Sequence, residues 1–401
     1  MQNNPCNRQY REMPADPLEI LRQLISIPSV NPACGGPQGL HGEARLTDFL
    51  EHYLSGLGLR TLRQPIEPRR DNLLALLPAG PSAASKQLLL LEAHQDTVST
   101  EGMTVAPFAA EVRGGKMYGR GACDVKGGLA VFLAAVARLT AAPPPSMPAL
   151  VLACTVNEEA GFSGAQGLAA GFHGELVSFL PAAPTACIVA EPTDLRPVVA
   201  HKGVVRWRCH TTGRAAHSSE PQRGENAIYR MARVVRALEN YANDTLLRLP
   251  PDPFCGGATL SVGTIAGGSG VNTVPDHATI EIDLRTLPGD DPLDAWREAQ
   301  SYLASCPELN FPVQHDAPHL SVAGLASDGN QSLAARLIAA GATGPPLGVA
   351  YSTNATAYAA VGIPTVVFGP GSITQAHTAD EWVAIEELQA AVEILIRLVG
   401  N

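Results

Sequence analysis

Short apolar runs that alternate with helical patterns constrain this chain more than any other feature of its sequence. Five such runs are present: Leu73–Leu77, Leu88–Leu91, Leu150–Val156, Ala186–Ala190 and Thr365–Phe368. A run that is apolar at every position is typical of a strand covered on both faces. The segments between and around the runs include four with a helical pattern: Pro17–Leu24, Glu43–Leu57, Gly127–Thr140 and Glu386–Val399. The alternation predicts an α/β fold, a mixed sheet with helices on both faces.

The middle of the chain has a different pattern. Val204–His210 and Ala278–Arg285 alternate strictly between apolar and polar residues, as half-exposed strands do. One further short strand is expected at Leu260–Gly263. Three helical segments are expected at Asn226–Tyr241, Pro292–Ala304 and Gln331–Ala340. We therefore predict a smaller α+β domain, residues 203–316, inserted into an α/β domain formed by residues 1–202 and 317–401.

Composition excludes two classes of protein. With 45% hydrophobic and 16% charged residues among 401, the chain is too apolar to be intrinsically disordered. Its formal net charge is −10. Its lysines do not cluster; they are Lys86, Lys116, Lys126 and Lys202. An acidic chain without a basic cluster is a poor partner for the phosphates of a nucleic acid.

The sequence also lacks the patterns of membrane and secreted proteins. Residues 1–20 are polar and mixed, without the apolar core of a signal peptide. The longest apolar stretch, Gly127–Ala137, ends at Arg138 and is shorter than the roughly 20 residues that span a bilayer. The eight cysteines are scattered without a C-x-x-C pair, as in proteins of a reducing compartment. We expect a cytoplasmic protein with no membrane or nucleic-acid partner.

Residues suited to metal binding follow the run Leu88–Leu91. His94 and Asp96 lie two positions apart, so in an extended segment they point the same way. That spacing suits an imidazole bound to a metal ion, with a carboxylate that orients it. By itself the pattern also fits an ordinary surface loop.

A glycine-rich turn precedes the expected helix at Gly127. In Tyr118–Gly128 the glycines allow a tight turn and a close approach to a ligand, and Asp124 could bridge two metal ions. The alternatives are that Asp124 caps the helix or that the turn binds a nucleotide. Neither G-x-G-x-x-G nor G-x-x-x-x-G-K-[ST] is present, which argues against the nucleotide.

Three more acids and a histidine follow the remaining runs. Glu158 and Glu159 end the run Leu150–Val156, and two adjacent carboxylates at a buried strand end need a neutralising partner or solvent. The nearby Gly161–Ala165 does not match the G-x-S-x-G motif of serine hydrolases. Glu191 follows Ala186–Ala190, and His377 comes after Thr365–Phe368.

Together these positions predict one polynuclear metal site. Open α/β sheets bind ligands at the carboxyl ends of their strands, where these side chains are expected. Nitrogen and oxygen ligands without a thiolate favour zinc, cobalt or manganese. A bridging carboxylate would hold two such ions about 3.5–4 Å apart.

In this order the motifs resemble the signature blocks of the aminoacylase-type dinuclear zinc metallopeptidases, and the resemblance extends from about residue 15 to the C-terminus. That family includes acetylornithine deacetylase, succinyl-diaminopimelate desuccinylase, aminoacylase, carboxypeptidase G and several dipeptidases. The resemblance implies two zinc ions, replaceable by cobalt or manganese. It assigns His94, Asp124 and Glu191 to one ion, and Glu159, His377 and the shared Asp124 to the other.

The resemblance also implies the roles of five further residues. Glu158 would be the general base, and Asp96 would orient His94. The inserted domain would be a lid and dimerisation domain, and its His217 would stabilise the oxyanion, usually across a dimer. Asn272 and Arg285 would hold the substrate carboxylate.

The expected reaction is hydrolysis of the amide bond of a small N-acyl-L-amino acid. Gly369–Glu381 is most similar to the acetylornithine deacetylase branch, which would place the enzyme in arginine biosynthesis as a homodimer. Tyr351–Asn354 departs from that branch, which carries an acid near Asn354 suited to a cationic side chain. Asn157 and Val125 also replace the more usual Asp and Met. The alternatives are a desuccinylase, a dipeptidase or carboxypeptidase of the same family, and an inactive metal-binding protein.

Overall fold

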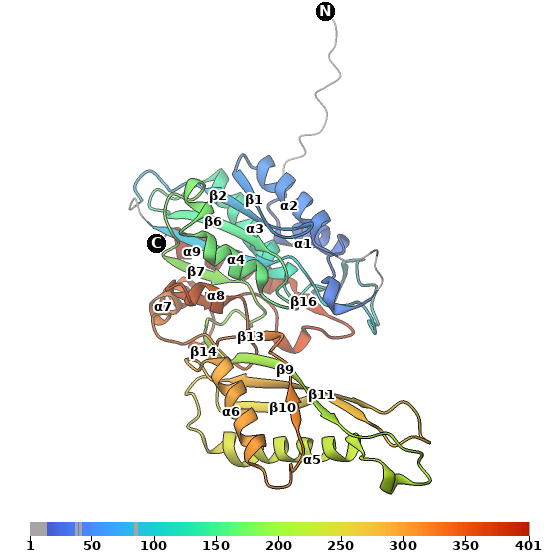
Figure 1. The fold of residues 1–401 in the computed structure, drawn as a ribbon. Helices are drawn as coiled ribbons and strands as arrows, with labels where there is room; N and C mark the ends of the chain where they lie inside the picture. Colours follow the sequence, from blue (N-terminus) through green and yellow to red (C-terminus); the bar gives the residue numbers. More distant parts are fainter. Residues whose placement is uncertain (1–13, 37–38, 40–41, 84–86, 401) are drawn as a thin grey trace, which may run out of the picture. The chain divides into compact units, whose positions relative to one another are not determined.

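The computed structural model describes residues 14–36, 39, 42–83 and 87–400. Residues 1–13 and Lys86, which entered the sequence argument, lie outside the described residues. The contacts divide the chain into two compact units (Figure 1). The first contains the chain up to Val199, Asp328–Leu347 and the residues from Thr353 onward; the second contains Ala200–Ser327 and Gly348–Ser352.

The first unit is built on a mixed eight-stranded sheet. Its order is β1 (Arg60–Glu67), β2 (Arg70–Leu77), β6 (Ala149–Thr155), β3 (Leu88–His94), β7 (Ala186–Val189), β15 (Thr365–Val367), β8 (Val198–His201) and β14 (Leu347–Val349). The four consecutive strands β6, β3, β7 and β15 are parallel, whereas β1 pairs antiparallel with β2, β2 with β6 and β8 with β15. Every residue of β3 and β6 is buried, as the apolar runs Leu88–Leu91 and Leu150–Val156 predict.

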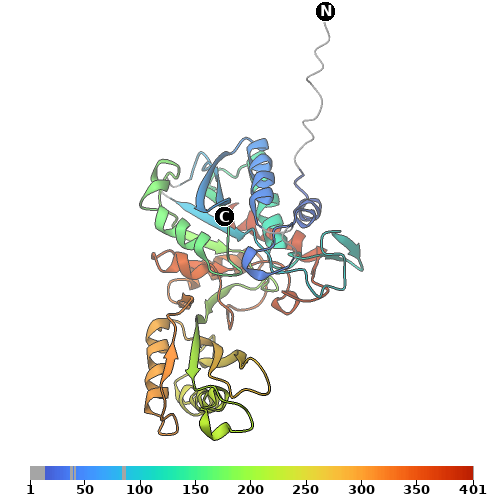
Figure 2. The ribbon, with the colours of Figure 1, turned by 45° about the vertical axis from the view of Figure 1, so that its right-hand side comes forward.

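Helices cover both faces of this sheet, which confirms the predicted fold class (Figure 2). From β3 the chain passes through α3 (Lys126–Ala141) to β6, then through α4 (Ser163–Gly171) back across β3 to β7. Because these crossovers run in opposite directions and are right-handed, α3 and α4 lie on opposite faces. The helices that pack with α3 are α1 (Pro17–Ser26) and α9 (Ile385–Gly400), and α8 (Ala355–Ala359) packs with α4. The remaining helices are α2 (Ala44–Gly56), against β1 and β2, and α7 (Gln331–Ala340), against α9.

Two glycines bring the start of α3 against the end of β7. A Cβ at Gly128 would lie 2.8 Å from the Cβ of Ala190, and one at Gly127 would lie 2.5 Å from the carbonyl oxygen of Ala122. Such distances exclude any larger residue without movement of the backbone. The turn that carries Asp124 is therefore held beside the strand that leads to Glu191.

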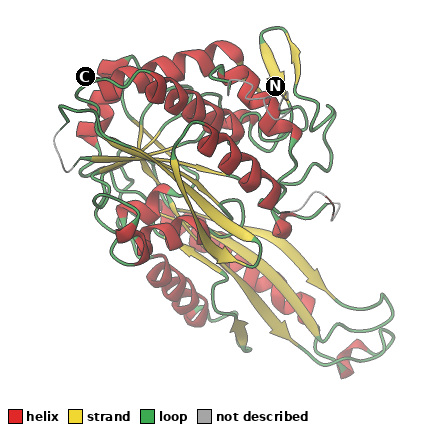
Figure 3. Cartoon of the chain, turned by 90° about the horizontal axis from the view of Figure 1, so that it is seen from above, coloured by secondary structure: helices red, strands yellow, loops and turns green. Residues whose placement is uncertain are grey.

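The second unit is an antiparallel sheet packed on helices (Figure 3). Its strands are β10 (Thr259–Gly267), β11 (His277–Thr286), β9 (Gly203–Thr212) and β12 (Val313–His315), in that order, with β13 (Leu320–Val322) also paired to β9. Burial alternates along β11, and its buried residues share a core with α5 (Ala227–Asn240) and α6 (Pro292–Ser305). The division after Ser327 differs from the predicted boundary at residue 316, because β13 pairs with β9.

A third, three-stranded sheet was not predicted. It consists of β4 (Glu111–Arg113), β5 (Lys116–Tyr118) and β16 (Trp382–Ala384) in the order β16-β5-β4. It joins the segment after His377 to the segment before Asp124. Among the described residues, no helix has the length and apolarity needed to span a membrane.

Candidate metal centre

The predicted ligands come together at one edge of the large sheet. His94 is the last residue of β3, Glu158 and Glu159 follow β6, and Glu191 follows β7. These strands are adjacent and parallel, so their carboxyl ends meet at the same edge. Asp124 reaches this edge from the turn before α3, and His377 from the loop after β15.

Asp124 lies between the two histidines. One of its carboxylate oxygens, Oδ1, is 3.1 Å from Nε2 of His94, and the other, Oδ2, is 3.3 Å from Nε2 of His377. Each of these imidazoles has a second carboxylate beside it: Glu191 Oε1 is 4.0 Å from His94 Nε2, and Glu159 Oε2 is 3.1 Å from His377 Nε2. The direct contacts thus form two sets of donors that share Asp124.

The donors fit divalent cations. In two triads the ligand atoms lie within 4.8 Å of one another: His94, Asp124 and Glu159 in one, and His94, Glu158 and Glu191 in the other. The second triad includes Glu158, the expected general base. The two triads therefore share residues with the predicted ligand sets but are not identical to them. Glu159 Oε1 is buried and has no hydrogen-bond partner among the residues that the structure describes. A cation would supply the partner that this oxygen lacks.

The charge state of the site also favours the binding of divalent cations. Burial and neighbouring carboxylates raise the pKa values of Glu158 and Glu191 well above the ordinary value, and that of Glu159 to about 7. Contacts with Asp124 and Glu159 raise the pKa of His377 to about 10. Without cations the cluster therefore takes up protons to offset its buried negative charge. Divalent cations can do this instead.

His94 is oriented so that Nε2 faces the cluster. Its Nδ1 lies 2.9 Å from the backbone carbonyl oxygen of Asp96, which can only accept, so Nδ1 carries the proton. The carboxylate of Asp96 is further away, 3.5 Å from the same nitrogen. Its oxygens accept hydrogen bonds from the backbone N–H groups of Glu158 (3.1 Å) and Glu159 (3.0 Å). Asp96 therefore connects the His94 segment to the turn that carries both glutamates.

Sequence reasoning gave no role to Glu381, although its carboxylate holds the Asp124 turn. Glu381 is fully buried, and its oxygens accept hydrogen bonds from the backbone N–H groups of Gly121 (3.0 Å), Cys123 (2.8 Å) and Asp124 (3.0 Å). Arg120 Nη1 also donates to it at 2.7 Å. The only sequence signal was its place four residues after His377.

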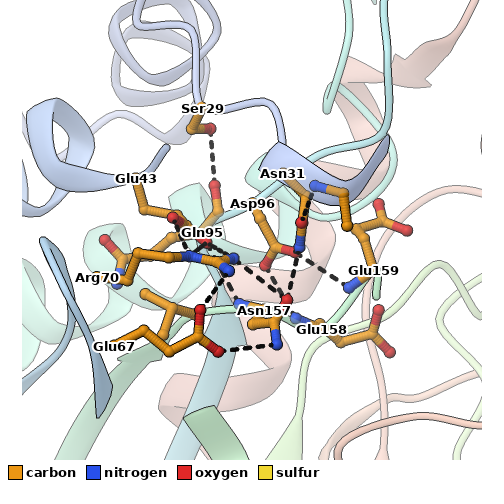
Figure 4. A network of polar contacts seen from close by, with 12 residues as sticks. Ser29, Asn31, Glu43, Glu67, Arg70, Gln95, Asp96, Asn157, Glu158 and Glu159 are labelled. Atoms are coloured by element: carbon orange, nitrogen blue, oxygen red, sulfur yellow. Dashed lines mark hydrogen bonds and ion pairs between the residues drawn. The ribbon is translucent and has the colours of Figure 1, made fainter. Parts of the chain in front are cut away.

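Asn31 is a second residue that the sequence reasoning missed (Figure 4). It is fully buried, and its Nδ2 donates to Asp96 Oδ2 at 2.7 Å and to Asn157 Oδ1 at 2.9 Å. Asn354, by contrast, is 1% exposed and donates to the buried Glu92 at 3.0 Å. Asn354 is therefore a buried partner of Glu92.

The three expected substrate residues lie in the second unit. His217 and Asn272 are exposed on adjoining loops, where the Ser218 N–H donates to the carbonyl oxygen of Asn272. Arg285 is near the end of β11, and Asn272 lies in the loop that precedes this strand, so the structure does not bring them together. The guanidinium of Arg285 is paired with Asp283, its Nε 2.6 Å from Oδ1.

Comparisons with known proteins agree with this geometry. Residues 90–401 match peptidase family M20/M25/M40. Acetylornithine deacetylase of Edwardsiella ictaluri is 31% identical, with 96% of this chain and 97% of that protein covered. The same enzyme of Vibrio vulnificus is 31% identical, with 94% and 96% covered.

Solved structures show the same fold. A tripeptidase from Staphylococcus aureus is similar with a TM-score of 0.74 and 20% identity, over 96% of this chain and 97% of its own. A Bacillus subtilis protein described as a dinuclear metal-binding peptidase of the M20 family has a TM-score of 0.64 and 17% identity, over 96% of each chain.

Proposed function

The chain belongs to peptidase family M20/M25/M40 and is a metal-dependent amidohydrolase, and on that premise we propose that it removes the acyl group from a small N-acyl-L-amino acid. N-Acetylornithine is the first substrate to test, because curated relatives that match nearly the whole chain are acetylornithine deacetylases. The carboxylate of Asp124 carries the proposal. It lies between two imidazoles, each of which has a further acid beside it.

We assign one zinc ion to His94, Asp124 and Glu191, and a second to Asp124, Glu159 and His377. Cobalt or manganese could replace zinc, because the donors are nitrogen and oxygen atoms only. When bound, the ions would lower the pKa of water and polarise the amide carbonyl. Nε2 is the ligand atom of both histidines, since it is the nitrogen that faces the carboxylates.

Glu158 is the proposed general base. Its carboxylate is within 4.8 Å of the ligand atoms of His94 and Glu191, so it adjoins the place where a water molecule would react. It would take a proton from the attacking water and pass it to the departing amine. Asp96 would hold the backbone of this residue and orient His94, a positioning role rather than a catalytic one.

The second unit supplies the proposed contacts to substrate and partner. His217 would donate a hydrogen bond to the oxyanion. Asn272 and Arg285 would contact the substrate carboxylate, and because they lie at opposite ends of β11 they would have to do so from different subunits. Dimerisation through this unit is favoured by the exposed edge strand β10, where Ile265 is 61% exposed, and by Tyr229 of α5, which is 69% exposed. Exposed apolar side chains beside an open edge are typical of an interface. We propose a cytoplasmic homodimer.

A panel of substrates tests this function. N-Acetyl amino acids, N-succinyl-diaminopimelate and dipeptides are incubated with the zinc- or cobalt-loaded protein, then with chelator, and then with metal restored. We expect cleavage of N-acetyl amino acids, its loss on chelation and its return with metal. Cleavage that resists chelation would contradict the metal mechanism. Exclusive cleavage of the succinyl compound or the dipeptides would replace the proposed substrate class.

A further inference from the structure

A polar network adjoins the Glu158–Glu159 turn, and Asn157 lies within it (Figure 4). Asn157 has a φ of +64°, in the left-handed region that few residues other than glycine adopt readily. Its backbone N–H donates to Glu43 Oε1 at 3.3 Å, and its carbonyl oxygen accepts from the N–H of Phe162 at 2.7 Å. The residue that directs the chain into the two glutamates is thus fixed on both sides.

The side-chain amide of Asn157 uses its full hydrogen-bonding capacity. Its Oδ1 accepts from Asn31 Nδ2 (2.9 Å) and Arg70 Nη2 (3.3 Å). Its Nδ2 donates to Ser163 Oγ at 2.8 Å and to Glu67 Oε1 at 3.3 Å. Two donors therefore surround the oxygen and two acceptors surround the nitrogen. Only an amide satisfies this arrangement, since a carboxylate would face the carboxylate of Glu67.

The partners of Asn157 are themselves anchored. Arg70 makes a two-pronged contact with the buried Glu43, at 2.9 Å from Nε and 2.5 Å from Nη2, and its Nη1 donates to Glu67 at 2.9 Å. Asn31 also donates to Asp96, which receives the backbone N–H groups of both glutamates. The amide of Asn157 thus couples the Arg70 ion pairs to the turn.

We propose that Asn157 is a positioning residue whose amide group aims Glu158 and Glu159, so that a carboxylate at this position would weaken the binding of one metal ion and slow turnover. The inference rests on the proposed function, because it assigns Glu159 to a metal ion. The inference goes beyond the proposed function because it identifies Asn157, which is not an assigned ligand, as a residue that affects metal binding.

Variants that exchange the hydrogen-bond donor and acceptor between Asn157 and Glu67 test the inference. Asn157→Asp creates two facing carboxylates, whereas the double variant Asn157→Asp, Glu67→Gln restores a hydrogen bond of reversed direction and the charge of the unmodified protein. Glu67→Gln alone leaves one acceptor oxygen, which can serve Asn157 or Arg70 but not both, because these two residues donate to different oxygens of Glu67. Asn157→Gly removes the amide but adopts positive φ freely, so it separates the side chain from the backbone. Glu51→Gln is the matched surface control, since Glu51 pairs with Arg63 outside the network.

The readouts are binding of Co²⁺ to the full metal-free chain by calorimetry, its visible absorption spectrum, kcat and KM, and the melting temperature. For Asn157→Asp and Asn157→Gly we expect about 10- to 100-fold weaker binding of one of two Co²⁺ ions, an altered spectrum and lower kcat, as for other partners of metal ligands. Glu51→Gln should resemble the unmodified protein, and Glu67→Gln alone should weaken Co²⁺ binding less than Asn157→Asp does. The double variant should recover affinity and spectrum.

Two results would overturn this inference without affecting the proposed function. One is unchanged Co²⁺ affinity and spectrum in both Asn157→Asp and Asn157→Gly. The other is a double variant that recovers its melting temperature but not its Co²⁺ affinity, since that pattern shows a purely structural role. If the unmodified protein binds no Co²⁺, the proposed function fails together with the inference, and the two failures are thereby distinguished.

Discussion

At the scale of single residues, the site depends on buried acids that are not ligands. Glu381 is fully buried, and its carboxylate accepts hydrogen bonds from the Asp124 turn. The donors are three backbone N–H groups and the guanidinium of Arg120. A carboxylate removed from water is tolerated only when its oxygens are satisfied in this way. Because Glu381 follows His377 by four residues, it ties the loop of one histidine to the carboxylate that both histidines share.

Glu381→Gln should therefore damage both stability and metal binding. Both oxygens of Glu381 accept hydrogen bonds, so either placement of the Gln amide sets a donor against donors. We expect a loss of about 3 kcal/mol in the free energy of unfolding, typical of a broken buried ion pair, and weaker metal binding. Chemical denaturation and metal analysis measure the two effects. Glu387→Gln is the control, because Glu387 accepts one backbone N–H from Gly371 at 2.6 Å and the Gln oxygen can replace it. Equal effects of the two changes would contradict the role of Glu381.

Glu158→Gln tests the proposed general base. Gln cannot accept the proton, while Glu158 contributes none of the ligand atoms that we assign to the two ions. Turnover should fall by about 10²–10⁴-fold, the typical contribution of general acid–base catalysis, with two metal ions retained. Steady-state kinetics and elemental analysis on the same sample provide the measurement. A variant that keeps its activity, or one that loses its metal, would assign this carboxylate a different role.

At the scale of elements, the sequence predicted the strands that carry a continuous apolar run or a strict alternation, and it missed strands without either pattern. The apolar runs identified β3, β6, β7 and β15, whose ends carry the proposed ligands or lead to them, because a strand covered on both faces carries a pattern that can be recognised locally. β1 contains Pro65 and few buried residues, and β8 is only four residues long, so neither has such a pattern.

The same limit applies to the site. Ligands at strand ends could be predicted because their position follows from the strand itself. Glu381 could not, since it bonds to residues up to 260 positions away through backbone N–H groups, which leave no trace in the sequence. Asn31 likewise reaches Asp96 across 65 positions. These contacts exist only after the elements have assembled.

His201, the last residue of β8, makes the stability of this region sensitive to acid. It is fully buried, and burial lowers its pKa to about 4. Its ordinary value is near 6.5, so between pH 6.5 and 4 the unfolded chain binds more protons and stability falls as the pH falls. The loss approaches about 3 kcal/mol near pH 4 and is absent above pH 7.

His201→Asn should therefore reduce the acid sensitivity of unfolding. Calorimetric melting at pH 7.5 and pH 4.5 gives the shift for each variant, and the shift should be smaller for His201→Asn than for the unmodified protein. His319→Asn, a change at a partly exposed histidine paired with Glu281, should leave it unaltered. An identical shift in all three proteins would mean that His201 does not control this behaviour.

At the scale of the whole molecule, the net charge of −10 is unevenly distributed. Five acids converge at the edge of the large sheet: Asp96, Asp124, Glu158, Glu159 and Glu191. The overall acidity, which argues against nucleic acid as a partner, thus includes a local charge that divalent cations can offset. The metal-free protein should be the less stable form, and its stability should depend on the ions that it binds.

Zinc or cobalt should therefore raise the melting temperature, and the increase should shrink as the pH falls from 8 to 6. At 100 times its dissociation constant each ion adds about 2.7 kcal/mol to the free energy of unfolding. His377, with a pKa of about 10, must release its proton to bind a metal ion, so affinity falls with decreasing pH. Below the pKa of Glu159, about 7, a second proton must leave and the fall steepens. Melting curves at pH 8, 7 and 6, with metal or with chelator, measure the effect. A melting temperature that metal leaves unchanged at pH 8 would show that these acids do not form a metal site.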